Sequence, residues 1–185
     1  MADATRTRIL DACVAILARD VSELSIPAVA REAGVSVPTV YRNFSDKRTL
    51  VRETERHLRK IRGQDERPTL PDHLDDLPRV VREQFARGAA TPEVVFAAIA
   101  STPITKLRLD MGMRAKRQAR VSELLRPHLR DYTPRERAHA VAMTTVLCSS
   151  ATLRAFLALT DLGAEDAAEA VCWTLDRILA PKRPQ

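Results

Sequence analysis

The sequence has few glycines and few aromatic residues. Only 5 of its 185 residues are glycine, and aromatic side chains make up 4% of the composition. No run alternates apolar and polar residues long enough to indicate a strand, whereas alanine, leucine, arginine and glutamate are abundant. We therefore predict an all-α protein of about nine helices, long enough for a small N-terminal domain and a larger body.

Neither the cysteines nor the histidines form a recognisable chemical motif. Cys13, Cys148 and Cys172 lack a CxxC or metal-ligand spacing, so we expect them to fill apolar core positions. The four histidines are scattered without an HxxxH pair, and no glycine-rich phosphate loop or nucleophile motif is present. These absences argue against an enzyme, the first alternative function, and predict neither a cofactor nor a metal.

The chain also lacks a basic and apolar leader. Met1–Arg8 is polar and runs into an amphipathic helix, which predicts a cytoplasmic protein. The most apolar stretch, Ala138–Leu159, carries His139, Arg154 and several hydroxyl residues, and this favours a helix buried in protein over a membrane span. The net charge of +6 would ease the approach to DNA, but an arginine-rich genome composition explains it equally well.

Two short helices separated by a tight turn are predicted behind an amphipathic helix over Thr5–Arg19. Ser25 is placed to cap the first short helix, which ends at Gly34, a residue that readily adopts the left-handed conformation. Ser36 is placed to cap the second, which continues to Phe44. Two short helices across such a turn form a helix-turn-helix.

Six further helices are predicted after this motif. One begins at Ser45 or Asp46 and extends to about Arg62, and Gly63–Pro71 is expected to be a loop. The other five are expected over Leu74–Arg87, Pro92–Ser101, Thr105–Arg130, Pro134–Leu159 and Ala164–Leu179. The last two are apolar on more than one face. Each is therefore expected either to pack between the core and a second subunit or to lie wholly buried in a monomer.

The segment from Ser25 to Val51, SIPAVAREAGVSVPTVYRNFSDKRTLV, closely resembles the DNA-binding segment of TetR-family repressors. The likeness rests on the serine cap, the AREAGVS run at Ala30–Ser36, Thr39 before Tyr41, and the later Phe44 and Lys47. The resemblance implies a helix-turn-helix DNA-binding domain over residues 1–47 and a helical ligand-binding and dimerisation domain over residues 48–185.

The resemblance also implies which residues contact double-stranded DNA. Thr39 and Tyr41 are expected at the backbone, Arg42 and Asn43 at base edges, and Lys47 at a phosphate. The full predicted set is Ser25, Ser36, Val37, Pro38, Thr39, Tyr41, Arg42, Asn43 and Lys47. Ala33, Val40 and Phe44 are expected in the core instead. The sequence departs from the family pattern at Asp20 and Val21, in a turn, and at Asn43, which leaves the operator sequence open.

By the same resemblance, the protein is expected to bind a palindromic operator as a homodimer and to be released by a small-molecule inducer. The predicted pocket residues, which could equally be ordinary core, are Phe85, Phe96, Ile99, Leu109, Met111, Met113, Met143 and Leu147. The predicted dimer interface comprises Thr145, Ser149, Leu153, Phe156, Val171, Leu175 and Ile178, and Trp173 could lie in either place. An alternative is a protein of this fold that acts through protein contacts without an inducer.

A basic stretch from Lys106 to Arg126 has two interpretations. It could form the mouth of a pocket for an anionic ligand such as an acyl-coenzyme A, or a solvated face balanced by Asp110 and Glu123.

Overall fold

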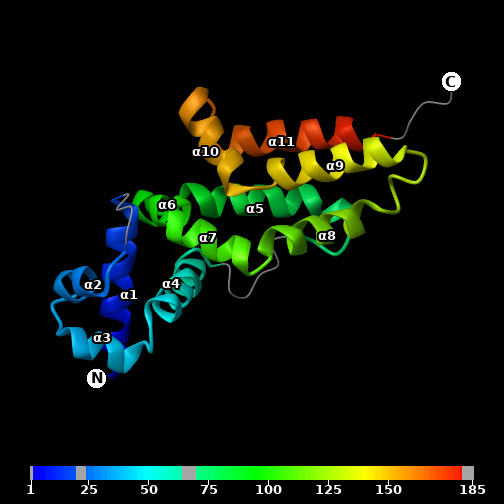
Figure 1. Ribbon diagram of the computed structural model, residues 1–185. Coiled ribbons are helices and arrows are strands. Elements are labelled where there is room, and N and C mark those ends of the chain that lie inside the picture. Colours follow the sequence, from blue (N-terminus) through cyan, green and yellow to red (C-terminus); the bar gives the residue numbers. More distant parts are fainter. Residues whose placement is uncertain (1, 20–23, 64–69, 181–185) are drawn as a thin grey trace. The chain divides into compact units, whose positions relative to one another are not determined.

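The computed structural model describes residues 2–19, 24–63 and 70–180 (Figure 1). Asp20, Val21 and most of the predicted Gly63–Pro71 loop lie outside these ranges. The described residues form helices and connecting turns without a strand, which confirms the all-α prediction. They contain eleven α-helices and one short 3₁₀ helix, η1, so the predicted number of about nine was too low.

The N-terminal helices are α1 (Ala2–Ala18), α2 (Ile26–Glu32), α3 (Val37–Asn43) and α4 (Lys47–Ile61). They are followed by η1 (Leu74–Asp76), α5 (Leu77–Ala89), α6 (Glu93–Ala100), α7 (Thr102–Asp110), α8 (Met113–Leu125), α9 (Pro134–Leu147), α10 (Ser150–Leu159) and α11 (Ala164–Leu179). The last helix has the predicted bounds, whereas α5 runs past the predicted end at Arg87, through the buried Gly88, to Ala89.

The helix predicted over Thr105–Arg130 is two helices. Gly112 adopts a left-handed conformation with φ of 64°, which ends α7 and separates it from α8. Pro103 falls between the helices predicted over Pro92–Ser101 and Thr105–Arg130, and it lies in the first turn of α7, where its missing N–H costs nothing. The sequence pattern concealed the break because apolar residues continue on both sides of the glycine.

The helix predicted over Pro134–Leu159 is also broken. At Cys148 and Ser149 the chain bends by 68° between α9 and α10. The Ser149 hydroxyl caps α10 by accepting a hydrogen bond from the Thr152 amide at 3.3 Å. In the described part of the chain, no single helix combines the length and hydropathy of a membrane span; only α9 and α10 taken together reach both, and they are bent.

The first of two compact units contains the described residues of Met1–Glu66 together with Thr91–Met113. Helix α1 lies at its centre and packs against α2, α4 and α6 (Figure 1). The core includes Ile9, Cys13, Leu17, Phe44 and Leu58, each at most 1% exposed. Phe44, Val40 and Ala33 are all buried, as predicted. This arrangement fixes the helix-turn-helix on a rigid base.

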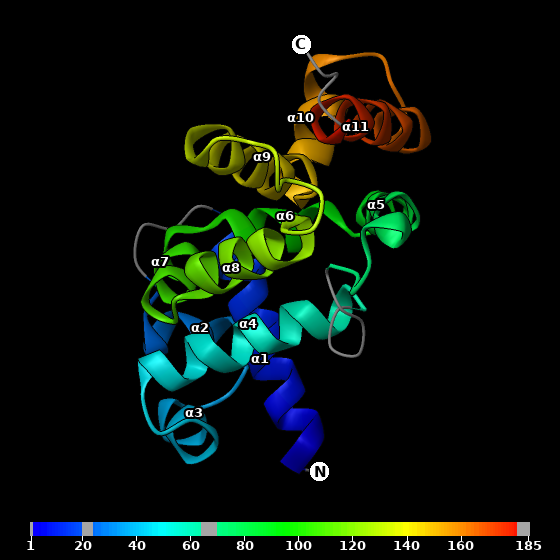
Figure 2. The same ribbon diagram turned by 90° about the vertical axis from the view of Figure 1, so that its right-hand side faces the viewer.

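The second unit contains the described residues of Arg67–Ala90 and Arg114–Gln185. Helix α11 packs along α5, and α10 contacts both (Figure 2). Its core includes Phe85, Val121 and Leu125. Cys148 and Cys172 are buried in this core and Cys13 in the other, so the three cysteines fill apolar positions as predicted. The functional boundary expected between residues 47 and 48 stays a prediction.

Candidate nucleic-acid interface

Two serine caps define the helix-turn-helix. The Ser25 hydroxyl accepts a hydrogen bond from the Ala28 amide and so caps α2, and the Ser36 hydroxyl accepts one from the Thr39 amide and caps α3, each at 3.3 Å. Between them, Gly34 adopts a φ of 61°, which a residue with a side chain rarely does. The local sequence therefore sets both the ends of the helices and the turn that joins them.

The inner face of α3 is anchored in the core of the first unit. Val40 and Phe44 are at most 1% exposed and hold the helix against its neighbours. Arg6 of α1 adds a polar anchor: its Nη1 donates a hydrogen bond to the Asn43 carbonyl at 2.8 Å, and its guanidinium lies 4.4 Å from the centre of the Phe44 ring. Its Nη2 also forms an ion pair with Glu53 of α4 at 2.9 Å.

Arg6 thus ties the C-terminal end of α3 to α1 and α4, and sequence reasoning missed it. Nothing in the local sequence marks it, because its partners lie 37 and 47 residues further along the chain. It is a positioning residue, since it acts on the recognition helix through Asn43 and Phe44.

The outer face of α3 carries the polar side chains. Tyr41 is 52% exposed, and Arg42 is exposed one residue further on. The Thr39 hydroxyl accepts a hydrogen bond from Arg42 Nη2 at 2.8 Å and lies 2.9 Å from the Ser36 hydroxyl. These contacts bring together a guanidinium and two hydroxyls, and the exposed Tyr41 adds a phenol from the same helix; all are groups suited to phosphates and base edges.

Asn43 has a different environment from the one expected. Its side chain is half-buried, and its Nδ2 donates a hydrogen bond to the Thr39 carbonyl at 2.8 Å, inside the same helix. In this conformation the amide is occupied by the helix, so contact with a base edge would require another rotamer. The base contact expected of Asn43 stays a prediction.

The start of α4 supplies a cation beside this surface. The Asp46 carboxylate caps the helix by accepting a hydrogen bond from the Thr49 amide at 2.7 Å, and this bond holds the pKa of Asp46 below its usual range. Lys47 is the first residue of α4 and is exposed. The capping carboxylate fixes the end of the helix, while the ammonium group remains free to meet a phosphate.

All predicted DNA-contact residues lie on three neighbouring elements. Helix α3 carries Val37, Pro38, Thr39, Tyr41, Arg42 and Asn43, with Ser36 as its cap. Ser25 caps α2, and Lys47 begins α4. The contacts themselves stay predictions.

The fold and this surface define a helix-turn-helix DNA-binding protein. Residues 9–54 match the family model described as bacterial regulatory proteins, tetR family. This segment is therefore of the tetR-family DNA-binding type, which indicates a DNA-binding transcriptional regulator. A search of curated proteins gave no match.

The predicted pocket residues are divided between the two units. Phe96, Ile99, Leu109, Met111 and Met113 belong to the first, and Phe85, Met143 and Leu147 to the second. Phe85 and Phe96 are buried, whereas Leu109, Met111 and Met143 are exposed. Neither unit brings all eight residues together, and their role in ligand binding stays a prediction.

The predicted dimer residues are mostly covered within a single subunit. Leu153, Val171 and Leu175 are at most 3% exposed and belong to the core of the second unit. Phe156 and Ile178 are partly buried against that core, and Thr145 and Ser149 are half-buried. Burial gives the three core residues a packing role inside the subunit, and the dimer contacts expected of the set stay a prediction.

The basic stretch from Lys106 to Arg126 is interrupted by the break at Gly112 and is partly neutralised. Arg108 contacts Glu55, Arg120 pairs with Asp72 and Glu123, and Arg117 donates a hydrogen bond to the Cys148 carbonyl. It is therefore not one continuous cationic face.

Proposed function

We propose that the protein is a ligand-responsive repressor that binds a palindromic operator as a homodimer and leaves it when an inducer binds. The observation that carries this proposal is the surface of α3, where Tyr41 and Arg42 are exposed while Val40 and Phe44 anchor the opposite face. A recognition helix requires that division between an anchored and an exposed face, because the exposed side chains must enter the major groove without losing their register.

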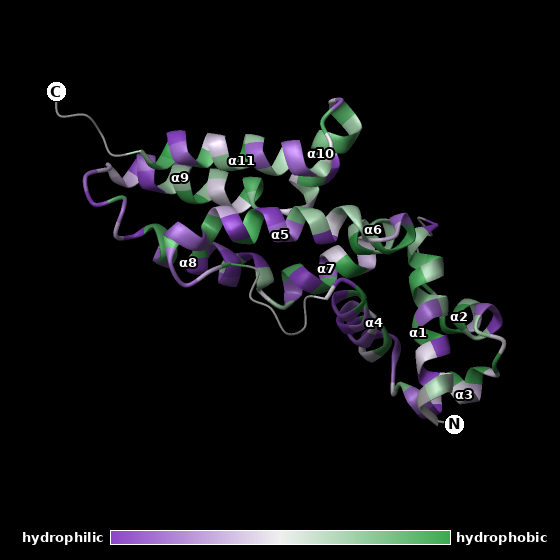
Figure 3. Ribbon diagram, turned by 180° about the vertical axis from the view of Figure 1, so that it is seen from behind, coloured by the Kyte–Doolittle hydropathy of each residue, from purple (hydrophilic) through white to green (hydrophobic). Residues whose placement is uncertain are grey.

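Exposed apolar side chains on the last three helices support the homodimer. Hydrophobic residues gather along α10 (Figure 3). The exposed large apolar residues of this region are Met143 and Val146 of α9, Leu157 and Leu159 of α10, Leu162 of the following turn, and Trp173 of α11. So much exposed apolar surface is typical of a face that binds a protein partner. Two subunits would then present their recognition helices to half-sites about 34 Å apart.

Trp173 provides a test of the dimer, because it is the single tryptophan of the chain and is 63% exposed in one subunit. Dimerisation through this face should shift its fluorescence to shorter wavelength as protein concentration rises, and no other indole contributes to that signal. Light scattering should report a doubled mass at the same time. Trp173→Glu should yield a monomer by light scattering, and a variant that stays dimeric would show that the interface is assigned wrongly.

Unpartnered polar atoms in the second unit support an inducer site there. Arg117 Nε of α8 and the Thr144 hydroxyl of α9 are buried without a hydrogen-bond partner among the described residues. Burial lowers the pKa of Arg117, as expected for a cation removed from water. A buried polar group without a partner is costly, and a polar ligand between these helices would satisfy both atoms. We place the inducer beside α8 and α9, within the second unit.

The DNA-binding part is tested by fluorescence anisotropy with DNA that flanks the protein's own gene, against a scrambled duplex of the same composition. Lys47→Ala should weaken specific binding by about tenfold for each subunit of the dimer, the effect of losing one charge-assisted contact per subunit. Lys60→Ala is the matched control, since Lys60 is an exposed lysine at the other end of α4. Equal affinity for both duplexes would contradict the proposal. A reporter gene behind the bound DNA would then give the sign of regulation.

A further inference from the structure

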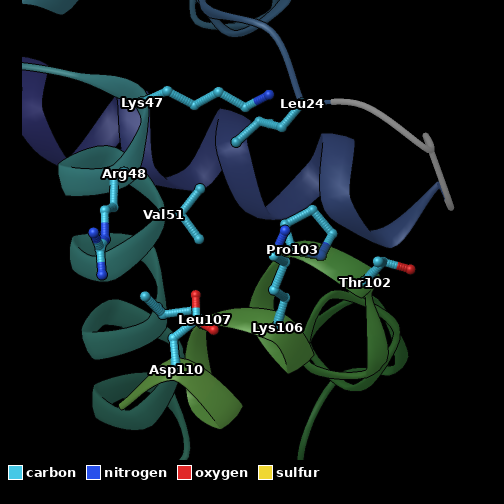
Figure 4. A pocket seen from close by; sticks show the side chains of 9 residues that line it. All are labelled: Leu24, Lys47, Arg48, Val51, Thr102, Pro103, Lys106, Leu107 and Asp110. Atoms are coloured by element: carbon cyan, nitrogen blue, oxygen red, sulfur yellow. The ribbon is translucent and has the colours of Figure 1, made fainter.

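An open groove lies between α4 and α7, wholly within the first unit. Its volume is about 580 Å³, within the range of about 300–1,000 Å³ that is usual for small-molecule sites. The start of α4 forms one wall and α7 the other (Figure 4). Its lining residues are Leu24, Lys47, Arg48, Val51, Thr102, Pro103, Lys106, Leu107 and Asp110.

The base of the groove is apolar. Leu24, Val51 and Leu107 each expose at most 7% of their surface, so their remaining exposed atoms meet the groove as part of a fixed core. Pro103 adds a rigid ring from the first turn of α7. Such a surface favours a hydrocarbon chain or ring, because contact with it removes apolar area from water on both sides.

The rim of the groove is cationic. Lys47 and Arg48 begin α4, Lys106 extends from α7 beside Pro103, and Asp110 is the single carboxylate of the lining (Figure 4). In the described part of the chain, none of the three cations forms an ion pair. Other arginines of the same unit do, such as Arg19 with Glu32 at 2.7 Å. The rim therefore keeps an excess of positive charge beside an apolar base.

We propose that this groove binds a small anionic amphiphile, a carboxylate on an apolar chain. The chain lies on Leu24, Val51 and Leu107, and the carboxylate is held by Lys106 and Lys47. A neutral apolar molecule would leave the cations unused, and a compact inorganic anion would leave the apolar base uncovered. The combination selects a molecule that has both parts.

Lys47 connects this site to DNA binding, and this step rests on the proposed function. The ammonium group that is expected to bind a phosphate also lines the groove, where Lys47 reaches across toward Leu24 (Figure 4). A carboxylate in the groove competes with the phosphate for that group. Because coupling between two ligands is reciprocal, operator DNA weakens amphiphile binding by the same factor.

The experiment measures binding of sodium decanoate to the full-length protein by calorimetry, below the concentration at which decanoate forms micelles. Decyltrimethylammonium has the same chain with the opposite charge and should bind more weakly by about tenfold or more. Lys106→Ala should weaken decanoate binding by about tenfold, and Lys106→Arg should restore it. Lys116→Ala removes another exposed lysine, on α8 and not among the lining residues of the groove, and should have no effect.

A second variant tests the groove by filling it. Thr102 is exposed at the rim, so Thr102→Trp should block decanoate without displacing core side chains. Circular dichroism checks that both variants keep the helical content of the parent. Unchanged decanoate affinity in Lys106→Ala and Thr102→Trp would overturn the proposal, as would equal binding of the cationic amphiphile.

The link to DNA is measured separately. Decanoate should reduce DNA binding by the parent but about tenfold less effectively in Lys106→Ala, with sodium acetate as the control for ionic strength. Lys106-dependent decanoate binding by a protein that binds no DNA would support the groove and contradict the proposed function. Specific DNA binding without any decanoate binding would support the proposed function and contradict the groove as a ligand site.

Discussion

Replacement of Arg6 tests how the recognition helix is held in place. Arg6→Met keeps the apolar stem of the side chain but removes the hydrogen bond to the Asn43 carbonyl, the ion pair with Glu53 and the contact with the Phe44 ring. The variant should therefore lose both global stability and DNA affinity, because α3 is then fixed at its C-terminal end only by apolar packing.

The size of the effect follows from these three interactions. A hydrogen bond from a charged donor contributes about 1.5–3 kcal/mol, an exposed ion pair about 0.2–1 kcal/mol and a cation–π contact about 0.5–1 kcal/mol. The Arg6 side chain is 35% exposed, so solvent weakens each contribution and the lower values apply. We expect a loss of about 2 kcal/mol, which corresponds to a fall of about 4–8 °C in Tm for a chain of this length.

Urea denaturation followed by circular dichroism measures the free energy of unfolding. Arg8→Met is the matched control, since Arg8 is an exposed arginine on the same helix, and it should change stability by less than about 0.5 kcal/mol. A double-mutant cycle with Glu53→Gln isolates the ion pair from the other contacts. If Arg6→Met and Arg8→Met have equal stability, Arg6 does not anchor α3.

Two further predictions concern buried groups. Glu55 of α4 is 2% exposed and contacts Arg108 of α7 at 3.3 Å. Glu55→Gln should therefore lower the free energy of unfolding, measured by urea denaturation, by about 1–3 kcal/mol. An unchanged urea midpoint would contradict a stabilising contact between Glu55 and Arg108. Burial raises the pKa of Cys13 and of Cys148 to about 11, so neither thiol should react with a thiol reagent at pH 8 until urea unfolds the chain. Because the thiols lose their protons at lower pH in the unfolded chain than in the folded protein, their contribution to stability should be intact below about pH 9 and decline toward pH 11. This decline in stability should be smaller in Cys13→Ala. Rapid labelling of the folded protein would contradict the assigned burial.

The N-terminal motif could be predicted from sequence because its signals are local. The caps and the turn involve only backbone groups within three residues of Ser25, Gly34 and Ser36, so the residues that form them are close together in the sequence. The same holds for the start of α11, which follows directly on Gly163. These elements appear in the structure where they were predicted.

The missed features depend on contacts that sequence patterns do not encode. Arg6 reaches Asn43 and Glu53 across tens of residues, and the groove is formed by α4 and α7, which are more than 40 residues apart in the chain. The breaks at Gly112 and Ser149 were missed for another reason: apolar residues continue through both, so periodicity alone joined two helices into one.

The salt dependence of DNA binding tests most directly whether α3 and the start of α4 contact DNA. The affinity for DNA flanking the protein's own gene is measured at several salt concentrations for the parent, Lys47→Ala and Lys60→Ala. Removing one phosphate contact should reduce the slope of log affinity against log salt by about 0.9. Lys47→Ala should therefore lower the slope by about 2 for a dimer, and Lys60→Ala should leave it unchanged. Identical slopes for all three proteins would contradict a phosphate contact at Lys47.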